Sequence, residues 1–341
     1  MTGRPLLSAE EVVALRRPAV RLASPRLDRP QDLQRETERL GPRVVPTATA
    51  FLTGAECPFR CVYCDLWRYT LPEATPEGSI ATQIEWTMEQ LRCPGGPPAV
   101  HTLKLYNASN FFDERAVPSM DDDAILEALT GLERVVVECH PRLLLGRRGA
   151  ERAQRYVDEL SGLEIAFGLE TTAPAGLEQI GKSATLAHFE RAFEAAHQMG
   201  ATTRAFVLHG IPREVEDEQD ADCQKSWTLE TVRWARDAGA SAVSVIPVRG
   251  GNGAMERLAE RGLWRRPNLA ELLTVAEAAM EFESPGFDVF VDCWDLETFA
   301  RDGHAEDAQR IERIRALDRN GRAAVASRST DQGIAGSGAR V

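Results

Sequence analysis

Short apolar runs alternate along the chain with longer stretches in which apolar residues have a helical spacing. The short runs are rich in β-branched residues, which is typical of strands buried on both faces. They cover residues 44–54, 101–109, 134–140, 163–170, 204–212, 241–250 and 287–294. In the longer stretches apolar residues recur three and four positions apart, which predicts helices over residues 79–91, 121–132, 185–200, 226–239 and 268–282. Typical boundary residues flank these helices, namely Ser79, Asp121 and Asn268 at starts and Gly200 and Gly239 at ends.

Alternation of strands with helices predicts parallel strands, right-handed crossovers and helices packed outside the sheet. Six or seven such units are too many for a short open sheet and too few for a closed eightfold barrel. We therefore expect an α/β fold, a partial (β/α)6 TIM-like barrel. In that architecture the chemistry gathers at the C-terminal ends of the strands.

The two ends of the chain differ from this central region. We expect residues 1–43 to form a helical N-terminal extension, residues 44–300 the barrel, and residues 301–341 a C-terminal helix followed by a disordered tail. The first residues include Arg but no apolar h-region, so we expect no secretory signal. No run approaches the roughly 18 apolar residues of a membrane span, so we expect no membrane association.

Composition and charge narrow the classes of partner. With 43% hydrophobic and 27% charged residues, the chain has the composition of a soluble globular protein. Its net charge of −12 disfavours autonomous binding to a phosphate backbone, unless a local basic patch or a partner protein overcomes the repulsion. Small molecules, peptides or other proteins are therefore the better candidates. Seven cysteines, three of them clustered, predict a reducing cytoplasm with metal-bound or free thiols.

The clustered cysteines lie in residues 57–64, which read CPFRCVYC. Lone cysteines are usually buried small hydrophobic residues, but Cys57, Cys61 and Cys64 share one proline-containing loop. A structural zinc site normally needs four protein ligands, and no second CxxC or HxxxH pair follows. An iron–sulfur cube held by three cysteines leaves one iron with an open position, which is what catalysis needs.

The C-x3-C-x2-C spacing directly after the first strand of a parallel α/β array resembles the radical S-adenosylmethionine superfamily. The resemblance implies that the three thiolates hold a [4Fe–4S] cluster whose fourth iron chelates the amino and carboxylate groups of S-adenosylmethionine. One electron then breaks the S–C5′ bond, and the 5′-deoxyadenosyl radical abstracts a substrate hydrogen atom. The protein would orient the reactants and exclude water and oxygen.

Three further stretches, residues 102–118, 167–182 and 249–269, resemble the Elongator-catalytic-subunit and methylthiotransferase-like branch. Within this branch they are most similar to the archaeosine-synthesis radical lyase type, and the resemblance covers about residues 40–295. That type implies cleavage of a C–N bond on a modified tRNA base with a partner enzyme. Because this chain is acidic and shows no added RNA-binding module, we expect nucleic acid only if a partner presents it.

The resemblance also implies cofactor-binding positions at the strand ends. Where the superfamily usually has a GGE-like segment for the methionine amino group, this chain departs from it and has Asn107, Ser109 and Asn110. Glu170 ends the strand over 163–170, where the superfamily often has a polar residue for the ribose hydroxyls. An ordinary turn and a buried structural glutamate are the alternative interpretations.

Two more cofactor positions follow from the resemblance. The loop with Arg249, Gly250 and Asn252 often abuts adenine in the superfamily, and as a backbone nest it would also suit a carboxylate; a glycine-rich turn is the alternative. Tyr63 holds a position where an aromatic residue commonly lies near the adenine. Trp67 and Arg68 are expected at the mouth of the site.

Three basic residues are weaker candidates for cofactor binding. Arg204 would suit the methionine carboxylate but opens its strand, which places it at the wrong end. The sequence leaves the roles of Lys182 and His188 open in the same way.

Two other cysteines fall at strand ends, in VVVECHP and VFVDCWDLE. Cys139 and Cys293 are the catalytic candidates, as hydrogen-atom donors, covalent attachment points or ligands to a second cluster; buried inert cysteine is the alternative. Asp292 and Asp295 flank Cys293 and could face a substrate. Cys93 and Cys223 fall in expected surface or linker regions, and we expect no role in the chemistry for either. Cys93 precedes a proline-glycine stretch.

The sequence thus predicts a cytoplasmic radical enzyme that carries out a lyase or rearrangement reaction on a small molecule, a modified amino acid or nucleoside, or a peptide. It would need an electron donor such as flavodoxin or ferredoxin. A structural module holding zinc or a cluster is one alternative. Use of S-adenosylmethionine as a methyl or aminocarboxypropyl donor is another.

Overall fold

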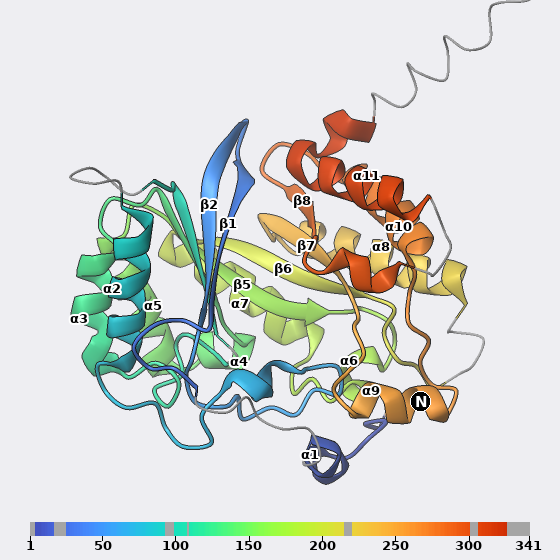
Figure 1. Ribbon diagram of the computed structural model, residues 1–341, viewed down its shortest axis with the longest axis horizontal. Coiled ribbons are helices and arrows are strands. Elements are labelled where there is room, and N and C mark those ends of the chain that lie inside the picture. Colours follow the sequence, from blue (N-terminus) through green and yellow to red (C-terminus); the bar gives the residue numbers. More distant parts are fainter. Residues whose placement is uncertain are drawn as a thin grey trace, which may run out of the picture.

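Eight strands form one sheet in their order along the chain (Figure 1). The computed structural model describes residues 4–16, 25–92, 99–107, 109–214, 220–300 and 306–325, with the side chain of Asn107 left out. The strands are β1 (Asp32–Leu40), β2 (Arg43–Leu52), β3 (Thr102–Asn107), β4 (Arg134–Glu138), β5 (Leu163–Glu170), β6 (Thr202–His209), β7 (Ala242–Pro247) and β8 (Asp288–Val291). Strands β2 to β8 are parallel, which confirms the predicted partial barrel.

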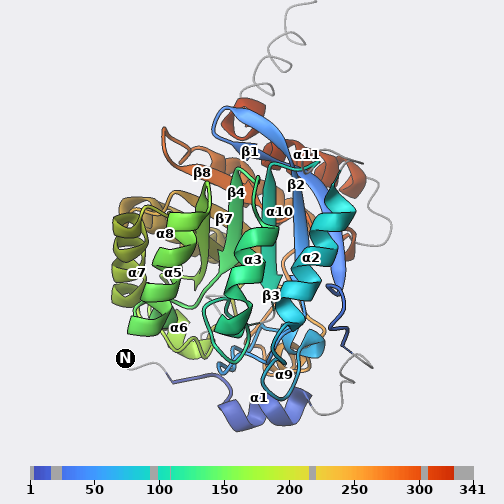
Figure 2. The ribbon, with the colours of Figure 1, turned by 90° about the vertical axis from the view of Figure 1, so that its left-hand side faces the viewer.

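Helices cover the outer face of the curled sheet, as Figure 2 shows for α2, α3, α5, α7 and α8. The helices are α1 (Ala9–Arg16), α2 (Ser79–Leu91), α3 (Asp122–Ala128), α4 (Pro141–Leu144), α5 (Arg147–Glu159), α6 (Gly176–Gln179), α7 (Leu186–Met199), α8 (Ala221–Asp237), α9 (Ala254–Glu260), α10 (Leu269–Met280) and α11 (Asp307–Asn320). Strand residues that face them, such as Val137, Ile165 and Val243, are fully buried. This layer of apolar contacts is the main core of the protein.

Local signals set the helix ends. Asn268 accepts hydrogen bonds from the amides of Ala270 and Glu271, which caps α10 as predicted. Gly200 ends α7 in the left-handed conformation that glycine adopts readily. Asp121 acts differently from the prediction, because its carboxylate accepts from the amides of Gly78 and Ile80 and so caps α2 rather than α3.

The N-terminal region departs from the predicted helical extension. Residues 9–16 are helical, but Asp32–Leu40 is strand β1, antiparallel to β2, so the helical prediction is wrong for these residues. Alternate side chains of β1 face the barrel interior, and Glu38 there is buried between Arg134 and Arg204, at 2.6 and 2.8 Å. Burial alone would raise the pKa of Glu38, but Arg204 and Lys104 hold it well below its usual range.

The two edges of the sheet are joined by side chains and by a helix. Arg39 of β1 pairs with Glu283 and donates to the carbonyl of Val289 in β8. Helix α11 packs against β8 and β1, and it lies within residues 301–341, where the sequence predicts a C-terminal helix. The predicted disordered tail falls outside the described residues from 326 onward, as does Cys93. None of the described helices is long and apolar enough to cross a membrane.

Candidate active site

The three clustered cysteines open into a cavity of about 890 Å³ inside the barrel. Cys57, Cys61 and Cys64 lie in the loop that follows β2, at the end of the barrel where α6 and α9 follow β5 and β7 (Figure 1). Cys61 is buried, and the other two are half-buried. The site therefore lies at the C-terminal ends of the strands, where the barrel architecture predicts it.

Neighbouring loops hold the cysteine loop in place. The amide of Val62 donates to the carbonyl of Ile180 at 3.0 Å, which ties this loop to the end of α6. The side-chain amide of Asn252 donates to the carbonyls of Val62 and Cys64, at 2.7 and 3.3 Å. Asn252, one of the residues predicted to contact the cofactor, thus supports the backbone of the cysteine loop.

The thiols affect one another electrostatically. Burial raises the pKa of Cys57 and of Cys61, and raises that of Cys64 to about 12, with the charge of Cys61 as the next cause. Three thiolates at this place therefore need a strong local positive charge, and the irons of a cluster would supply it. The donor set of this loop fits a cluster held by three thiolates.

A single metal ion fits less well. Within the described residues, no group of three or more His, Cys, Asp or Glu side chains is arranged to hold one metal ion. In a cluster each thiolate binds a different iron, so the three sulfurs need not converge on one point. This finding disfavours the zinc alternative, which requires four ligands around one ion.

A buried ion pair faces the cysteines. Lys182 Nζ lies 2.7 Å from Glu170 Oε1, and the two side chains are only 10% and 5% exposed. A β-carbon at Gly168 would overlap the ends of both side chains, so a larger residue there would have to displace the ion pair. Burial lowers and Glu170 raises the pKa of Lys182, and the net shift is upward. Lys182, which the sequence left open, is therefore a cation fixed beside the thiols.

The charge of Lys182 acts on the cysteines directly. It lowers the pKa of Cys61 and of Cys57 against the effect of burial. Tyr63 is close to the same groups, because burial and then the charges of Cys61 and Glu170 raise its pKa well above the usual value. Glu170 and Tyr63 thus lie where the sequence predicts cofactor contacts. No sequence spacing signals the approach of Lys182, which depends on the fold.

The segment after β3 also reaches the cavity. Ser109 and Asn110 line it, and the hydroxyl of Ser109 is buried without a partner among the described residues. Asn110 Nδ2 lies 3.6 Å from the sulfur of Cys57, and its Oδ1 accepts from the amide of His140 at 2.7 Å. Asn107 is the third predicted residue of this segment, and its side chain is not among those that the structure describes.

His140 is a site residue that the sequence did not single out. Its ring stacks on Phe59 of the cysteine loop with 3.9 Å between ring centroids, and it lines the cavity. Burial lowers its pKa to about 2, so the imidazole is neutral. The amide of Arg142 donates to Nδ1 at 3.4 Å, which leaves the proton on the buried Nε2.

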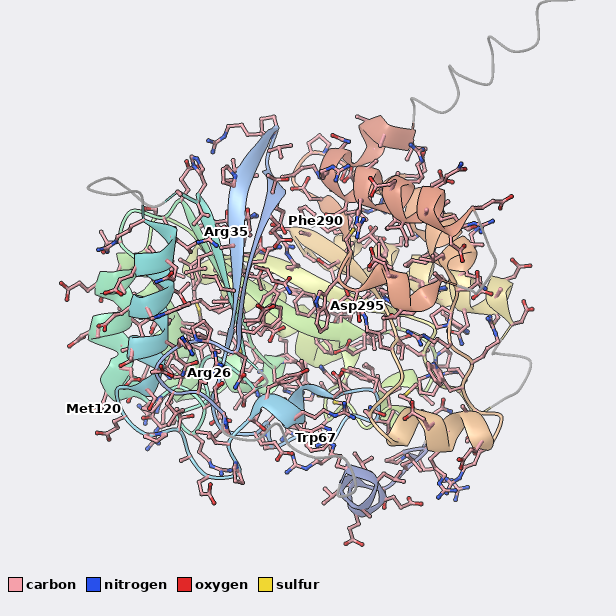
Figure 3. The ribbon with its side chains drawn as sticks, in the orientation of Figure 1. Arg26, Arg35, Trp67, Met120, Phe290 and Asp295 are labelled. Atoms are coloured by element: carbon pink, nitrogen blue, oxygen red, sulfur yellow. The ribbon has the colours of Figure 1, made fainter. Side chains whose placement is uncertain are left out.

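The loop after β7 contributes one predicted residue to the cavity. Arg249 lines it and pairs with Asp292 at 2.8 Å. Gly250 packs against Glu256 and Trp264 rather than facing the cavity. Asp295 lines the cavity near β8 (Figure 3).

Other predicted positions serve the scaffold. Near the cysteine loop the cavity is lined by Asp65 and Leu66, while Trp67 is buried beside Arg16. Arg68 donates to the carbonyl of Gly251. His188 belongs to the capping box of α7.

The two remaining candidate cysteines both line the cavity. The thiol of Cys139 donates to the carbonyl of His140 at 3.3 Å, and that of Cys293 to the carbonyl of Val291 at 3.4 Å. Burial raises the pKa of Cys139 to about 12 and that of Cys293 well above its usual value. Both are therefore neutral thiols at pH 7. Cys223 is on α8, outside the barrel.

The deep part of the cavity has aromatic and charged walls. Phe51 contacts Tyr106 edge to face and stacks near Trp294, and Tyr106 contacts Phe206 in turn. Arg204 pairs with the buried Glu38 and so lies away from the cysteines, as its position at the start of its strand predicts. These walls give a substrate both apolar surface and polar groups.

Solved structures with this fold have been found by comparison. The chain is similar to the Elp3 protein of the archaeon Methanocaldococcus infernus, with 13% identity and a TM-score of 0.50 over 84% of this chain. It spans 63% of that Elp3 chain. This likeness shows that the chain has the partial-barrel fold of Elp3.

Two further structures are more distant. One is TsrM from Kitasatospora setae, a radical S-adenosylmethionine methyltransferase with cobalamin and a [4Fe–4S] cluster bound, at 16% identity and a TM-score of 0.40 over 60% of this chain and 38% of that chain. The other is spore photoproduct lyase complexed with dinucleoside spore photoproduct, at 13% identity and a TM-score of 0.46 over 70% of this chain and 75% of that chain. No protein-family model and no curated protein sequence matches the chain.

Proposed function

We propose that the protein is a radical S-adenosylmethionine enzyme with a [4Fe–4S] cluster on Cys57, Cys61 and Cys64. One observation carries the proposal: the three thiols of a C-x3-C-x2-C loop open into a single barrel cavity of about 890 Å³. When bound, the cluster and S-adenosylmethionine supply a 5′-deoxyadenosyl radical that abstracts a substrate hydrogen atom. The residues of the chain position the reactants and exclude water.

Specific residues have specific tasks in this proposal. Glu170 and Lys182 bind the polar groups of the nucleoside, and Tyr63 covers it. Arg249 and the segment with Ser109 and Asn110 contact the methionine part. The cavity lies inside the barrel, whose walls limit the access of solvent to the reacting atoms.

The reaction we propose is a lyase or rearrangement reaction on a small molecule in the cytoplasm, with electrons from a flavodoxin or ferredoxin. Cys139 and Cys293 are protonated thiols that line the same cavity. A protonated thiol can give a hydrogen atom to a substrate radical, which leaves a thiyl radical; one electron from the same electron donor and one proton from solvent then restore the thiol. We assign this task to Cys293, which lies beside Asp292 and Trp294 on the part of the cavity wall that we assign to the substrate.

Anaerobic reconstitution tests the proposal. We expect about four irons per chain, broad visible absorption, and 5′-deoxyadenosine when dithionite and S-adenosylmethionine are added. The Cys57→Ala, Cys61→Ala and Cys64→Ala variants should lose all three, while Cys223→Ala on the outer helix α8 should keep them. A colourless protein with bound zinc contradicts the proposal. Formation of 5′-methylthioadenosine or S-adenosylhomocysteine instead supports group transfer from S-adenosylmethionine.

A further inference from the structure

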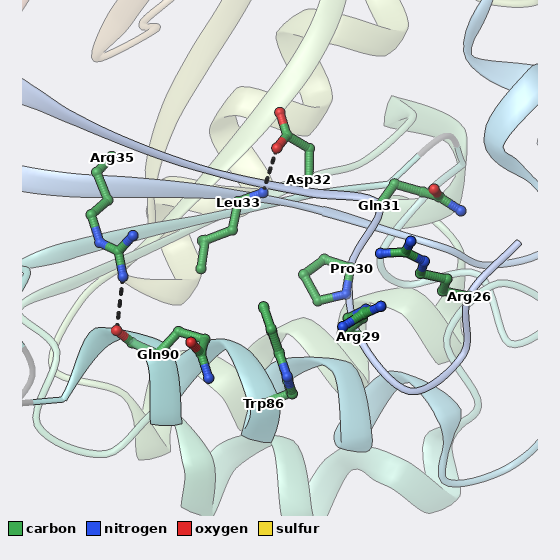
Figure 4. Close-up of a pocket in the computed structure, with 9 residues that line it drawn as sticks. All are labelled: Arg26, Arg29, Pro30, Gln31, Asp32, Leu33, Arg35, Trp86 and Gln90. Atoms are coloured by element: carbon green, nitrogen blue, oxygen red, sulfur yellow. Dashed lines mark hydrogen bonds between the residues drawn. The ribbon is translucent and has the colours of Figure 1, made fainter.

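A second, smaller hollow of about 290 Å³ lies on the outer side of β1, next to α2 (Figure 4). Its lining contains three arginines, an indole ring and two glutamines, and consists of Arg26, Arg29, Pro30, Gln31, Asp32, Leu33, Arg35, Trp86 and Gln90. We call it the arginine pocket. Of these residues only Gln31 and Asp32 also line the barrel cavity that contains the three cysteines.

The alternation of β1 separates opposite charges. Asp32, Glu36 and Glu38 line the large barrel cavity, whereas Leu33 and Arg35 face the opposite side, toward α2. Figure 4 shows the Asp32 carboxylate pointing away from Arg29 and Trp86. That carboxylate accepts from the amide of Leu33 at 2.9 Å and from Gln34 Nε2 at 2.8 Å. The pocket therefore keeps a positive charge although one aspartate borders it.

The guanidinium groups of the pocket have no carboxylate partner in the described part of the chain. Arg35 donates through Nη2 to the carbonyl of Gln90 at 2.8 Å and makes no ion pair there. Arg29 Nε and Gln31 Nε2 are buried donors without an acceptor among the described residues. Buried donors are normally satisfied, so these two need an acceptor from water or from a ligand.

Among the described residues, these three arginines form no ion pair, although the chain as a whole has a net charge of −12. A guanidinium group presents a planar fork of N–H donors that matches the oxygens of a phosphate group. The volume of about 290 Å³ suits a phosphate with a small part of a ligand rather than a whole large ligand. Trp86 and Pro30 provide apolar surface beside it.

The arginine pocket adjoins the barrel cavity, because Gln31 and Asp32 line both. The amide of Gln31 donates to the carbonyl of Phe51 at 2.8 Å and closes the strand pair there, so a ligand anchored by a phosphate in the pocket would reach the cavity around the start of β1 and not through the sheet. The pocket can therefore bind one part of a substrate, outside the part of the cavity that we assign to S-adenosylmethionine.

We propose that the arginine pocket binds the phosphate group of a phosphorylated small-molecule substrate. This inference rests on the proposed function, since it names the class of substrate that the radical would attack. Arg29 holds the phosphate oxygens. Arg35, which is turned toward Gln90 on the other side of Trp86 (Figure 4), and Arg26 add positive charge to the pocket. The negative charge of the rest of the chain opposes a long polyanion, so a phosphate ester of low molecular weight is the occupant.

Titration calorimetry on the reconstituted enzyme tests the proposal, with inorganic phosphate, pyrophosphate, a mononucleotide and a tetranucleotide RNA as probes. We expect the phosphate probes to bind to the wild type, and the Arg29→Gln/Arg35→Gln variant to weaken Kd at least about tenfold. Arg29→Lys/Arg35→Lys keeps the charge without the fork and should show an intermediate loss. Arg147→Ala is the control, because Arg147 is an exposed arginine of α5 paired with Glu151.

Equal phosphate binding by wild type and the Arg29→Gln/Arg35→Gln variant would overturn the proposal, and so would no binding to either. Affinity that rises with each added nucleotide would overturn the small-molecule class in favour of nucleic acid. Release of 5′-deoxyadenosine without substrate is measured in the same preparations. If that release fails while phosphate binding depends on Arg29 and Arg35, the radical function fails and the phosphate site stands.

Discussion

The side-chain amide of Asn110 donates a hydrogen bond to the sulfur of Cys57, with 3.6 Å between Nδ2 and Sγ. The orientation of this amide is fixed, because its oxygen accepts from the backbone amide of His140 at 2.7 Å. Asn110 therefore joins the cysteine loop to the start of α4. It also places an N–H donor on one of the three proposed cluster ligands.

Removing this donor should change the cluster before it changes the fold. Hydrogen bonds to cluster sulfurs raise the reduction potential, so Asn110→Ala should lower it. A net hydrogen bond of about 1 kcal/mol corresponds to a shift on the order of 40 mV for one electron. Redox titration followed by electron paramagnetic resonance, without S-adenosylmethionine, measures the shift. Ser109→Ala is the neighbouring control and should leave the potential unchanged; an equal shift in both variants would refute the specific role of Asn110.

Gly181 supports the cysteine loop from the other side. Its carbonyl is 3.9 Å from the sulfur of Cys61, its φ is +73°, and a β-carbon would lie 3.2 Å from the carbonyl oxygen of Arg60. Gly181→Ala should therefore cost about 1–2 kcal/mol in backbone conformation, and it should also displace the loop and reduce iron content. Iron analysis and urea unfolding measure the two effects.

Gly262 offers the matched control. Its φ is +69°, and a β-carbon there would meet nothing within 4 Å. Gly262→Ala should thus lose a similar amount of stability and keep its iron. If Gly181→Ala also binds iron as the wild type does, the contact with Arg60 has no influence on the cysteine loop.

The parallel part of the fold was predictable because its pattern is local. Apolar runs and helical spacing mark strands and helices within single segments, and α2 covers residues 79–91 as predicted. Strand β1 was not predictable in this way, because residues 32–40 read DLQRETERL and look like a polar helix. Its carboxylates are acceptable inside a barrel because Arg134 and Arg204, which are far away in the sequence, neutralise Glu38.

The same distinction applies to the site. The spacing of Cys57, Cys61 and Cys64 is a local signal, so the sequence predicted them together. The position of Lys182 is set by the path of the chain after α6, and its partner Glu170 is on a different element. The sequence placed Glu170 near the cofactor but could not show that a lysine holds it.

The Lys182–Glu170 pair provides a stability test. Lys182→Met leaves the buried carboxylate of Glu170 without its cation, so the free energy of unfolding should fall by about 3–5 kcal/mol. Replacing both residues, in Lys182→Met/Glu170→Leu, should restore much of this loss, because no unpaired charge remains. Urea unfolding of the cluster-free protein measures both.

An exposed pair serves as the comparison. Arg147 and Glu151 are 79% and 62% exposed, so Arg147→Ala should change the free energy of unfolding by less than about 1 kcal/mol. A loss for Lys182→Met that is no larger than the loss for Arg147→Ala would show that the buried pair does not stabilise the site.

Asp318 of α11 should make stability depend on pH. It faces the cavity and accepts from the amide of Val291 at 3.0 Å, and burial raises its pKa to about 6. In the unfolded chain the pKa of an aspartate is about 3.9, so the folded protein binds the proton more tightly. The contribution of Asp318 is therefore most favourable below about pH 4, declines as the pH rises toward about 6, and is constant above that.

Asp318→Asn cannot ionise and should remove this decline. Relative to wild type, the variant should gain up to about 3 kcal/mol between about pH 4 and pH 7, given about 1.4 kcal/mol for each pKa unit. Burial is the main cause of the raised pKa of Asp318; Lys104 lowers this pKa, and Glu38 and Glu36 raise it further. Urea unfolding of both proteins across this pH range gives the difference directly. A difference that does not vary with pH would mean that Asp318 ionises equally easily in the folded and unfolded chains, and α11 would then contribute packing to the cavity wall but no titrating group.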